Sequence, residues 1–253
     1  MATRCMRGLP SRSGCDHILT TSVRSVKIES MNSERSDLEA RAARHAALAD
    51  PARLRIVDLL TLSDLSPREL QDRLGMASNL IAHHLGVLER ERMIVRTRSE
   101  GDRRRSYVHL TSAASEGLGP SASAAARRVV FVCTGNSARS QLAAALWRQR
   151  SEIPAASAGT KPAERVSPGA IAVAERHGLD LAGATPQHVQ DVMADTDFIV
   201  TVCDAAHEVL ERGAELHWSV PAPGAAGTDA AYDAAFDDLA ARVDVLAERL
   251  APA

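Results

Sequence analysis

The stretch "VVFVCTGNSARSQLAAALW" at residues 129–147 decides the fold of the C-terminal half. Its first five residues form a continuous β-branched and aromatic run, which is typical of a strand buried on both faces of a parallel sheet. The alanine- and leucine-rich run that follows favours a helix. The short loop between them therefore joins the end of a buried strand to a helix N-terminus.

This loop contains a cysteine and an arginine six positions apart, Cys133 and Arg139. Its backbone N–H groups and the following helix N-terminus can converge on one point, which favours binding of an oxyanion and stabilises a thiolate. The planar guanidinium of Arg139 can donate hydrogen bonds to two oxygens of a tetrahedral anion at once, which a lysine does less well. No Gly-Lys-Ser/Thr follows, which excludes a nucleotide P-loop. The predicted oxyanion-binding residues are Thr134, Gly135, Asn136, Ser137, Ala138 and Ser140.

Strand and helix patterns alternate after the loop, which predicts a doubly wound α/β domain with a parallel sheet over 127–253. With "VFVCTGNSARSQLAAAL", "SAGT" at 157–160, "TVCDAA" at 201–206 and "HWSVP" at 217–221, this part resembles the low-molecular-weight protein tyrosine phosphatase fold and, within it, the arsenate reductases. The resemblance implies that Cys133 is the catalytic nucleophile and that Arg139 binds the oxyanion.

Two departures from the resembled family affect the expected chemistry. Ala222-Pro223 stands where an Asp-Pro pair would supply the general acid, whose loss costs roughly 10²–10⁴-fold in rate. Asp229 is a nearby substitute. Cys203 matches the second cysteine of the thioredoxin-coupled reductases, or it is a small apolar residue that ends a strand.

The third cysteine of those reductases would fall near Leu210. Cys203 is therefore a candidate redox residue that would pass the disulfide directly to an external reductant. The reductant would be an external low-molecular-weight thiol or a thioredoxin- or glutaredoxin-type protein, with no other cofactor.

Residues 36–116 carry a second pattern, with several short helices followed by a basic hairpin. Asp50-Pro51 and Ser66-Pro67 are expected helix starts, Glu69 stands at the capping-box position after Ser66, and Gly75 is the expected helix end. Buried stripes are expected at Leu54, Val57 and Leu60, or at Ile56 and Leu60, and in the next helices at Ile81, Leu85 and Leu88. A tight turn between two short helices is typical of a helix-turn-helix.

This part resembles the ArsR/SmtB family of winged-helix repressors through "LADPARLRIVDLL" and "SNLIAHHLGVLERERMI". The resemblance implies a mainly α winged helix-turn-helix domain that binds double-stranded operator DNA as a homodimer. The predicted DNA-binding residues are Ser78, Asn79 and His83 on a helix and Arg103, Arg104 and Arg105 in the hairpin. The region lacks the Cys-x-Cys pair of the metal-sensing members, so no metal site is expected.

The remaining segments complete the predicted domain organisation. Residues 1–35 read as a disordered tail, with a transit peptide or a start at Met31 as alternatives, and 117–126 as a linker of Gly, Pro, Ser and Ala. The chain of 253 residues has a net charge of −2 and is 45% hydrophobic, and it carries no apolar run long enough to cross a membrane. Its four cysteines show no paired spacing, which favours a cytoplasmic location.

Two functions fit these patterns. In the first, the chain is an arsenic-linked transcriptional regulator that carries a thiol-dependent arsenate reductase. In the second, the C-terminal domain binds arsenate or phosphate with little or no turnover and acts as a sensor for the DNA-binding half. A low-activity phosphotyrosine phosphatase is a further alternative. The intact Cys133 and Arg139 favour the first function, and Ala222 favours the second.

Overall fold

The computed structural model describes residues 39–111, 114, 124–210 and 213–253. The chain divides into two compact units, Met1–Ala47 and Leu48–Ala253. The described part of the first unit is helical, as predicted there. The predicted tail, 1–35, and residues 117–123 of the predicted linker lie outside the described residues. All elements below belong to the second unit.

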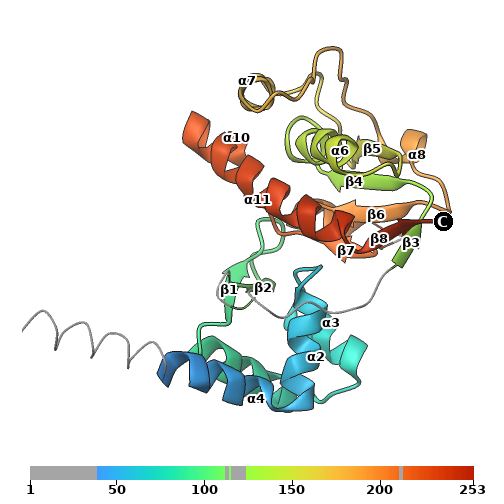
Figure 1. Cartoon of the computed structure of the whole chain (residues 1–253). Helices are drawn as coiled ribbons and strands as arrows, with labels where there is room; N and C mark the ends of the chain where they lie inside the picture. Colours follow the sequence, from blue (N-terminus) through green and yellow to red (C-terminus); the bar gives the residue numbers. More distant parts are fainter. Residues whose placement is uncertain (1–38, 112–113, 115–123, 211–212) are drawn as a thin grey trace, which may run out of the picture. The chain divides into compact units, whose positions relative to one another are not determined.

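The second unit begins with three helices and a hairpin, in the order predicted (Figure 1). The elements are α2 (Pro51–Leu60), α3 (Pro67–Leu74), α4 (Ser78–Arg90), β1 (Ile94–Arg98) and β2 (Ser106–Leu110). Strands β1 and β2 pair antiparallel. The Asp50 side chain caps α2, and Ser66 and Glu69 form a capping box on α3. Gly75 ends α3 with a φ of 64°, so these local predictions are confirmed.

The buried stripes of these helices are also largely as predicted. Ile81, Leu85 and Leu88 of α4 are fully buried. In α2 the stripe runs through Ile56, Val57 and Leu60, whereas Leu54 is 39% exposed, so the alternative that included Leu54 is wrong. At 100° per residue, Leu54 lies about 110° around the helix from the centre of that stripe, which places it outside the buried face.

The C-terminal half is an α/β structure around a four-stranded parallel sheet with the order β5-β4-β6-β7. The strands are β4 (Val129–Cys133), β5 (Ala155–Gly159), β6 (Phe198–Thr201) and β7 (Leu216–His217). After β4 the chain first adds β5 on one side of this strand, and it later adds β6 on the other side. The loops after β4 and β6 therefore diverge at the carboxyl edge, where ligands bind in such sheets.

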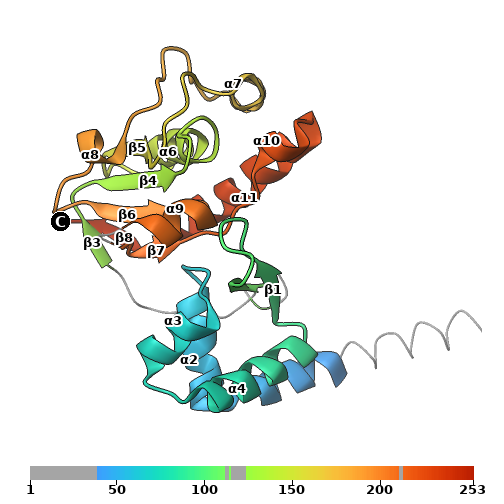
Figure 2. The ribbon, with the colours of Figure 1, turned by 180° about the vertical axis from the view of Figure 1, so that it is seen from behind.

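Six helices accompany this sheet: α6 (Arg139–Arg150), α7 (Pro168–Arg176), α8 (Val189–Val192), α9 (Asp204–Val209), α10 (Pro223–Ala226) and α11 (Asp229–Ala247). Helix α11 packs on α6 and α7, and α9 packs on β4 and β6. Figure 2 shows the same elements from behind. Strand β3 (Ala124–Ala126) pairs in parallel with β8 (Leu250–Pro252), so the last three residues of the predicted linker are a strand.

The segment between α2 and α3 forms hydrogen bonds with β7 and the residue that follows it. The backbone N–H of Asp64 donates to the carbonyl of His217 at 2.7 Å, and the backbone N–H of His217 donates to the Ser63 hydroxyl at 2.9 Å. The Trp218 indole N–H donates to the carbonyl of Leu62 at 2.9 Å. The helical half is thus joined to the sheet by buried bonds. Among the described residues, no helix is long and apolar enough to cross a membrane.

Candidate active site

The loop between β4 and α6 starts from a fully buried strand. Cys133 is the last residue of β4 and only 3% exposed. Helix α6 begins at Arg139 and its N-cap, Ala138, makes no side-chain hydrogen bond to the first turn. The first N–H groups of α6 are therefore not occupied by a capping side chain, which leaves them available to an anion.

The carbonyl groups of this loop are bound by one neighbouring segment. The carbonyls of Cys133, Thr134, Gly135 and Ser137 accept hydrogen bonds of 2.8–3.1 Å from the backbone N–H groups of Thr160, Lys161, Ala163 and Ser167. In a trans peptide the C=O and the N–H point in opposite directions. Because the carbonyls turn toward residues 160–167, the intervening N–H groups turn inward and form a nest for an anion.

Hydrogen bonds converge on the Cys133 sulfur at the floor of this nest. The backbone N–H of Asn136 donates to Sγ at 3.2 Å, and the Ser140 hydroxyl lies 3.0 Å from it. Asn136 has a φ of 48° and is fully buried. An N–H donor and a hydroxyl both stabilise a negative sulfur. Cys133, Asn136 and Ser140, predicted as members of one site, therefore lie together.

Two glutamines that the sequence analysis did not single out hold the Asn136 side chain. Its Oδ1 accepts hydrogen bonds from Gln141 Nε2 at 3.1 Å and from the backbone N–H of Gln187 at 2.8 Å. Its Nδ2 donates to the Ser140 hydroxyl at 2.9 Å. Gln141 lies only five residues along the chain and could have been found from its position on α6, whereas nothing local marks Gln187.

Arg139 lies at the rim of the loop with a side chain that is 12% exposed. Its Nη1 donates to the carbonyl of Val220 at 2.7 Å and lies 3.4 Å from a carboxylate oxygen of Glu100. Glu100 belongs to the loop that joins β1 and β2. The hairpin predicted to meet DNA therefore contributes a side chain beside the loop 133–139, called the oxyanion loop below.

Cys203 lies after β6, beside the loop after β4. Its sulfur is 3.4 Å from the Thr134 hydroxyl, and the residue is 2% exposed. Burial raises the pKa of the Cys203 thiol, the positive charge of Arg139 opposes this shift, and the Cys133 sulfur adds to it. Both thiols thus belong to one electrostatic environment.

The position where a general acid was expected is occupied by Ala222, the N-cap of α10. Asp229, the substitute considered above, is exposed in the first turn of α11 and interacts with Arg176. The structure brings a different carboxylate to Ala222, because both carboxylate oxygens of Glu100 accept from its backbone N–H at 3.1 Å.

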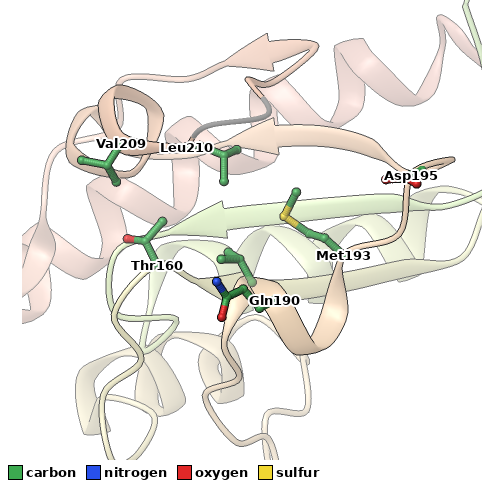
Figure 3. Close-up of a pocket in the computed structure, with 7 residues that line it drawn as sticks. Thr160, Gln190, Met193, Asp195, Val209 and Leu210 are labelled. Atoms are coloured by element: carbon green, nitrogen blue, oxygen red, sulfur yellow. The ribbon is translucent and has the colours of Figure 1, made fainter.

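Leu210, where a third cysteine was considered, lines a pocket between α8 and α9 (Figure 3). The figure shows Val209 and Leu210 facing Met193 and Gln190, with Thr160 beside them. Position 210 thus provides an apolar wall rather than a thiol. Within the described ranges, no group of three or more His, Cys, Asp or Glu side chains could hold a metal ion.

The predicted DNA-binding residues are all exposed. Ser78, Asn79 and His83 lie on the first half of α4, and Arg103, Arg104 and Arg105 lie in the loop between β1 and β2. Arg104 pairs with Asp102 at 3.1 Å. The same loop is hydrogen-bonded to α9, where the hydroxyl of the buried Ser99 donates to Glu208 at 2.6 Å. Only part of the predicted hairpin, residues 94–110, is therefore an open surface that could contact DNA.

Gly159, the last residue of β5, is expected to be intolerant of a side chain. A Cβ there would lie 2.7 Å from the carbonyl oxygen of Thr134 and 3.0 Å from the backbone N of Asn136, and neither can move without opening the loop. We expect Gly159→Ala to lower the free energy of unfolding by about 1–3 kcal/mol in urea titrations.

Gly86 in the middle of α4 is the matched control, because a Cβ there would meet nothing within 4 Å. Gly86→Ala should raise stability by about 0.5–1 kcal/mol. Equal effects of the two substitutions would contradict the close contact at Gly159.

Taken as chemistry, the site places a sulfur nucleophile beneath inward N–H groups and an arginine. Such an arrangement attacks the central atom of a tetrahedral oxyanion and stabilises the charge on its oxygens. The fold and the site thus define an α/β domain with a buried cysteine at the floor of a loop that is suited to an oxyanion.

Comparison with known proteins agrees with this class. Residues 128–252 match the family described as low molecular weight phosphotyrosine protein phosphatase. The arsenate reductase of Halalkalibacterium halodurans is 32% identical over 133 residues, which cover 47% of this chain and 94% of the relative. The glutaredoxin arsenate reductase of Synechocystis sp. is 35% identical over 80 residues, 30% of this chain and 60% of the relative. A solved arsenate reductase from Archaeoglobus fulgidus is 31% identical and covers 47% of this chain and 98% of its own, with a TM-score of 0.43.

The chain belongs to the low molecular weight phosphotyrosine protein phosphatase family. Its C-terminal half is an arsenate reductase-like domain of that superfamily. The family match begins at residue 128, so α2, α3, α4 and the hairpin lie outside it.

Proposed function

We propose that the C-terminal half reduces arsenate with Cys133 as the nucleophile. The observation that carries this proposal is the Cys133 sulfur at the floor of the loop, with the Asn136 N–H and the Ser140 hydroxyl directed at it and Arg139 at the rim. The curated relatives named arsenate reductase support the choice of arsenate as the oxyanion.

The reaction has two steps. The Cys133 thiolate first forms a sulfur–arsenic bond as one arsenate oxygen leaves as water. A second thiol then attacks the Cys133 sulfur, a disulfide forms, and the electron pair of the sulfur–arsenic bond passes to arsenic, which leaves as arsenite. The two thiols are oxidised and As(V) is reduced to As(III).

The second thiol is a low-molecular-weight thiol, or Cys203 followed by a thioredoxin- or glutaredoxin-type reductant. The shared environment of Cys133 and Cys203 supports the latter, and the relative named glutaredoxin arsenate reductase supports a glutaredoxin-type partner. The experiment that tests the function supplies the full chain with arsenate and each reductant in turn and measures arsenite. No arsenite with any of them would contradict it.

A second proposed role is regulatory. Residues 36–116 would act as a winged helix-turn-helix that binds operator DNA as a homodimer, with the oxyanion site as a sensor. The contact of Glu100 with Arg139 favours this role, because an anion bound by Arg139 would compete with a residue of the hairpin. A low-activity phosphotyrosine phosphatase remains an alternative for the C-terminal half, consistent with its family.

Replacing Arg103, Arg104 and Arg105 together with alanine is expected to weaken binding to any DNA duplex. These exposed side chains would each neutralise a phosphate. The negative slope of the log of the binding constant against the log of the salt concentration should therefore become shallower by about 2–3. Fluorescence anisotropy with a labelled random duplex over a salt series measures this slope. Arg165→Ala, at an exposed position of the other half, is the control, and equal slopes for the two variants would contradict DNA binding by the hairpin.

A further inference from the structure

The tip of the hairpin between β1 and β2 is fixed on α9. The backbone N–H of Glu100 donates to Asp204 at 2.7 Å, and that of Asp102 donates to Glu208 at 2.8 Å. A Cβ on Gly101 would lie 2.5 Å from Glu208 Oε2 and 2.9 Å from the Cα of Ala205, so the two backbones are in close contact. The position of Glu100 is therefore set by backbone bonds on both sides of it.

The Glu100 carboxylate lies between the oxyanion loop and the segment after β7. It accepts from the backbone N–H of Ala222 through both oxygens at 3.1 Å, and one oxygen is 3.4 Å from Arg139 Nη1. The side chain is 45% exposed, compared with 12% for Arg139. The carboxylate thus borders the candidate active site and is partly open to solvent.

The first chemical step needs a proton donor beside the bound arsenate. When the thiolate attacks arsenate, the departing oxygen needs a proton to leave as water. An acidic residue at position 222 would hold its carboxylate near its own backbone N–H, because only two carbon atoms separate them. Alanine at 222 leaves that space to the carboxylate of Glu100.

We propose that Glu100 is the general acid for the attack of Cys133 on arsenate, an inference that rests on the proposed reductase function. The sulfur–arsenic bond forms, an arsenic–oxygen bond breaks, and the proton of the Glu100 carboxyl passes to the leaving hydroxyl. Thiolate, dihydrogen arsenate and protonated Glu100 thus give the monoanionic sulfur–arsenic adduct, water and the Glu100 carboxylate. The carboxylate then regains its proton from solvent.

Arg139 brings the substrate and Glu100 together. One oxygen of the Glu100 carboxylate is 3.4 Å from Arg139 Nη1, so an arsenate held by Arg139 would lie beside that carboxylate.

The test compares wild type with Glu100→Gln in single-turnover reactions of the full chain with arsenate and an external thiol. Gln keeps the shape and an acceptor for the Ala222 N–H but has no acidic proton. We expect arsenite formation at saturating arsenate to slow by about 10²-fold or more, while arsenate affinity stays equal or rises because the competing charge beside Arg139 is gone. Adding Ala222→Asp to Glu100→Gln should recover at least about tenfold.

Two further variants make the result specific. Gly101→Val displaces the tip from α9 while Glu100 remains in the sequence, and it should slow the reaction as Glu100→Gln does. Glu152→Gln, at an exposed position between α6 and β5, should have no effect.

The outcomes separate this inference from the proposed function. An active wild type with an unchanged Glu100→Gln variant overturns the role of Glu100 and leaves the reductase function standing. A faster variant with tighter arsenate binding overturns it as well, since the carboxylate would then only block the loop. A wild type that forms no arsenite with any reductant overturns the reductase function itself, and the role of Glu100 with it.

Discussion

Cys133→Ser is expected to abolish arsenite formation, with a loss of at least about 10³-fold. A serine hydroxyl in the same place is a far weaker nucleophile than a thiolate and cannot form the disulfide that releases arsenite. The measurement is arsenite produced per protein in the presence of an external thiol, compared with wild type at equal concentration.

The same variant should still bind the oxyanion. The inward N–H groups and Arg139 do not depend on the sulfur, so calorimetric titration with phosphate or arsenate should give an affinity within about tenfold of wild type. Cys203→Ser is the matched control: it should retain turnover with a low-molecular-weight thiol and lose it with a thioredoxin- or glutaredoxin-type reductant. Substantial arsenite formation by Cys133→Ser would show that the reaction does not pass through this residue.

The predictable parts of the structure are those whose causes lie close together in the sequence. The capping box of α3 involves Ser66 and Glu69, and its end needs only Gly75, so composition and spacing were sufficient. The same is true of the loop from Cys133 to Ser140, where strand, loop and helix follow one another directly. Local signals of this kind predicted the order of the main helices and strands in both halves.

The site could be predicted only in part, because its other contributors come from distant positions. Gln187 holds Asn136 from 51 residues away, and Glu100 reaches Ala222 across 122 residues. Neither residue carries a local signal, since glutamine and glutamate are ordinary at exposed loop positions. The basic hairpin illustrates the same limit: its arginines were evident, but its tip binds α9, which only the tertiary structure specifies.

Asp64 is expected to be the most sensitive of the charged residues that join the two halves. Its side chain is 3% exposed and accepts from the Ser219 N–H at 2.7 Å and Arg242 Nη1 at 2.9 Å, with His109 Nδ1 at 3.1 Å. Burial opposes its ionisation, but Arg242 and His109 outweigh this and hold its pKa below the usual range. The carboxylate is therefore charged and fully partnered at neutral pH.

Asp64→Ala should lower the free energy of unfolding by about 3–5 kcal/mol. The substitution removes the buried carboxylate shared by Arg242, His109 and the Ser219 N–H and leaves Arg242 with only the more exposed Asp238, and breaking a buried ion pair carries a cost of that size. For a unit of about 200 residues this corresponds to a fall in Tm on the order of 10 °C, measurable by calorimetry.

Asp238→Ala provides the control, because Asp238 also pairs with Arg242 at 2.7 Å but is 36% exposed. Its loss should cost about 0–1 kcal/mol, since Arg242 keeps Asp64 and water replaces the missing carboxylate. If the two halves form one cooperative unit, Asp64→Ala will move a single transition to lower temperature. Two separate transitions in wild type, with Asp64→Ala affecting neither, would instead mean that the bonds between residues 62–64 and 217–219 contribute nothing to stability, and that Glu100 is not held at the active site by the fold.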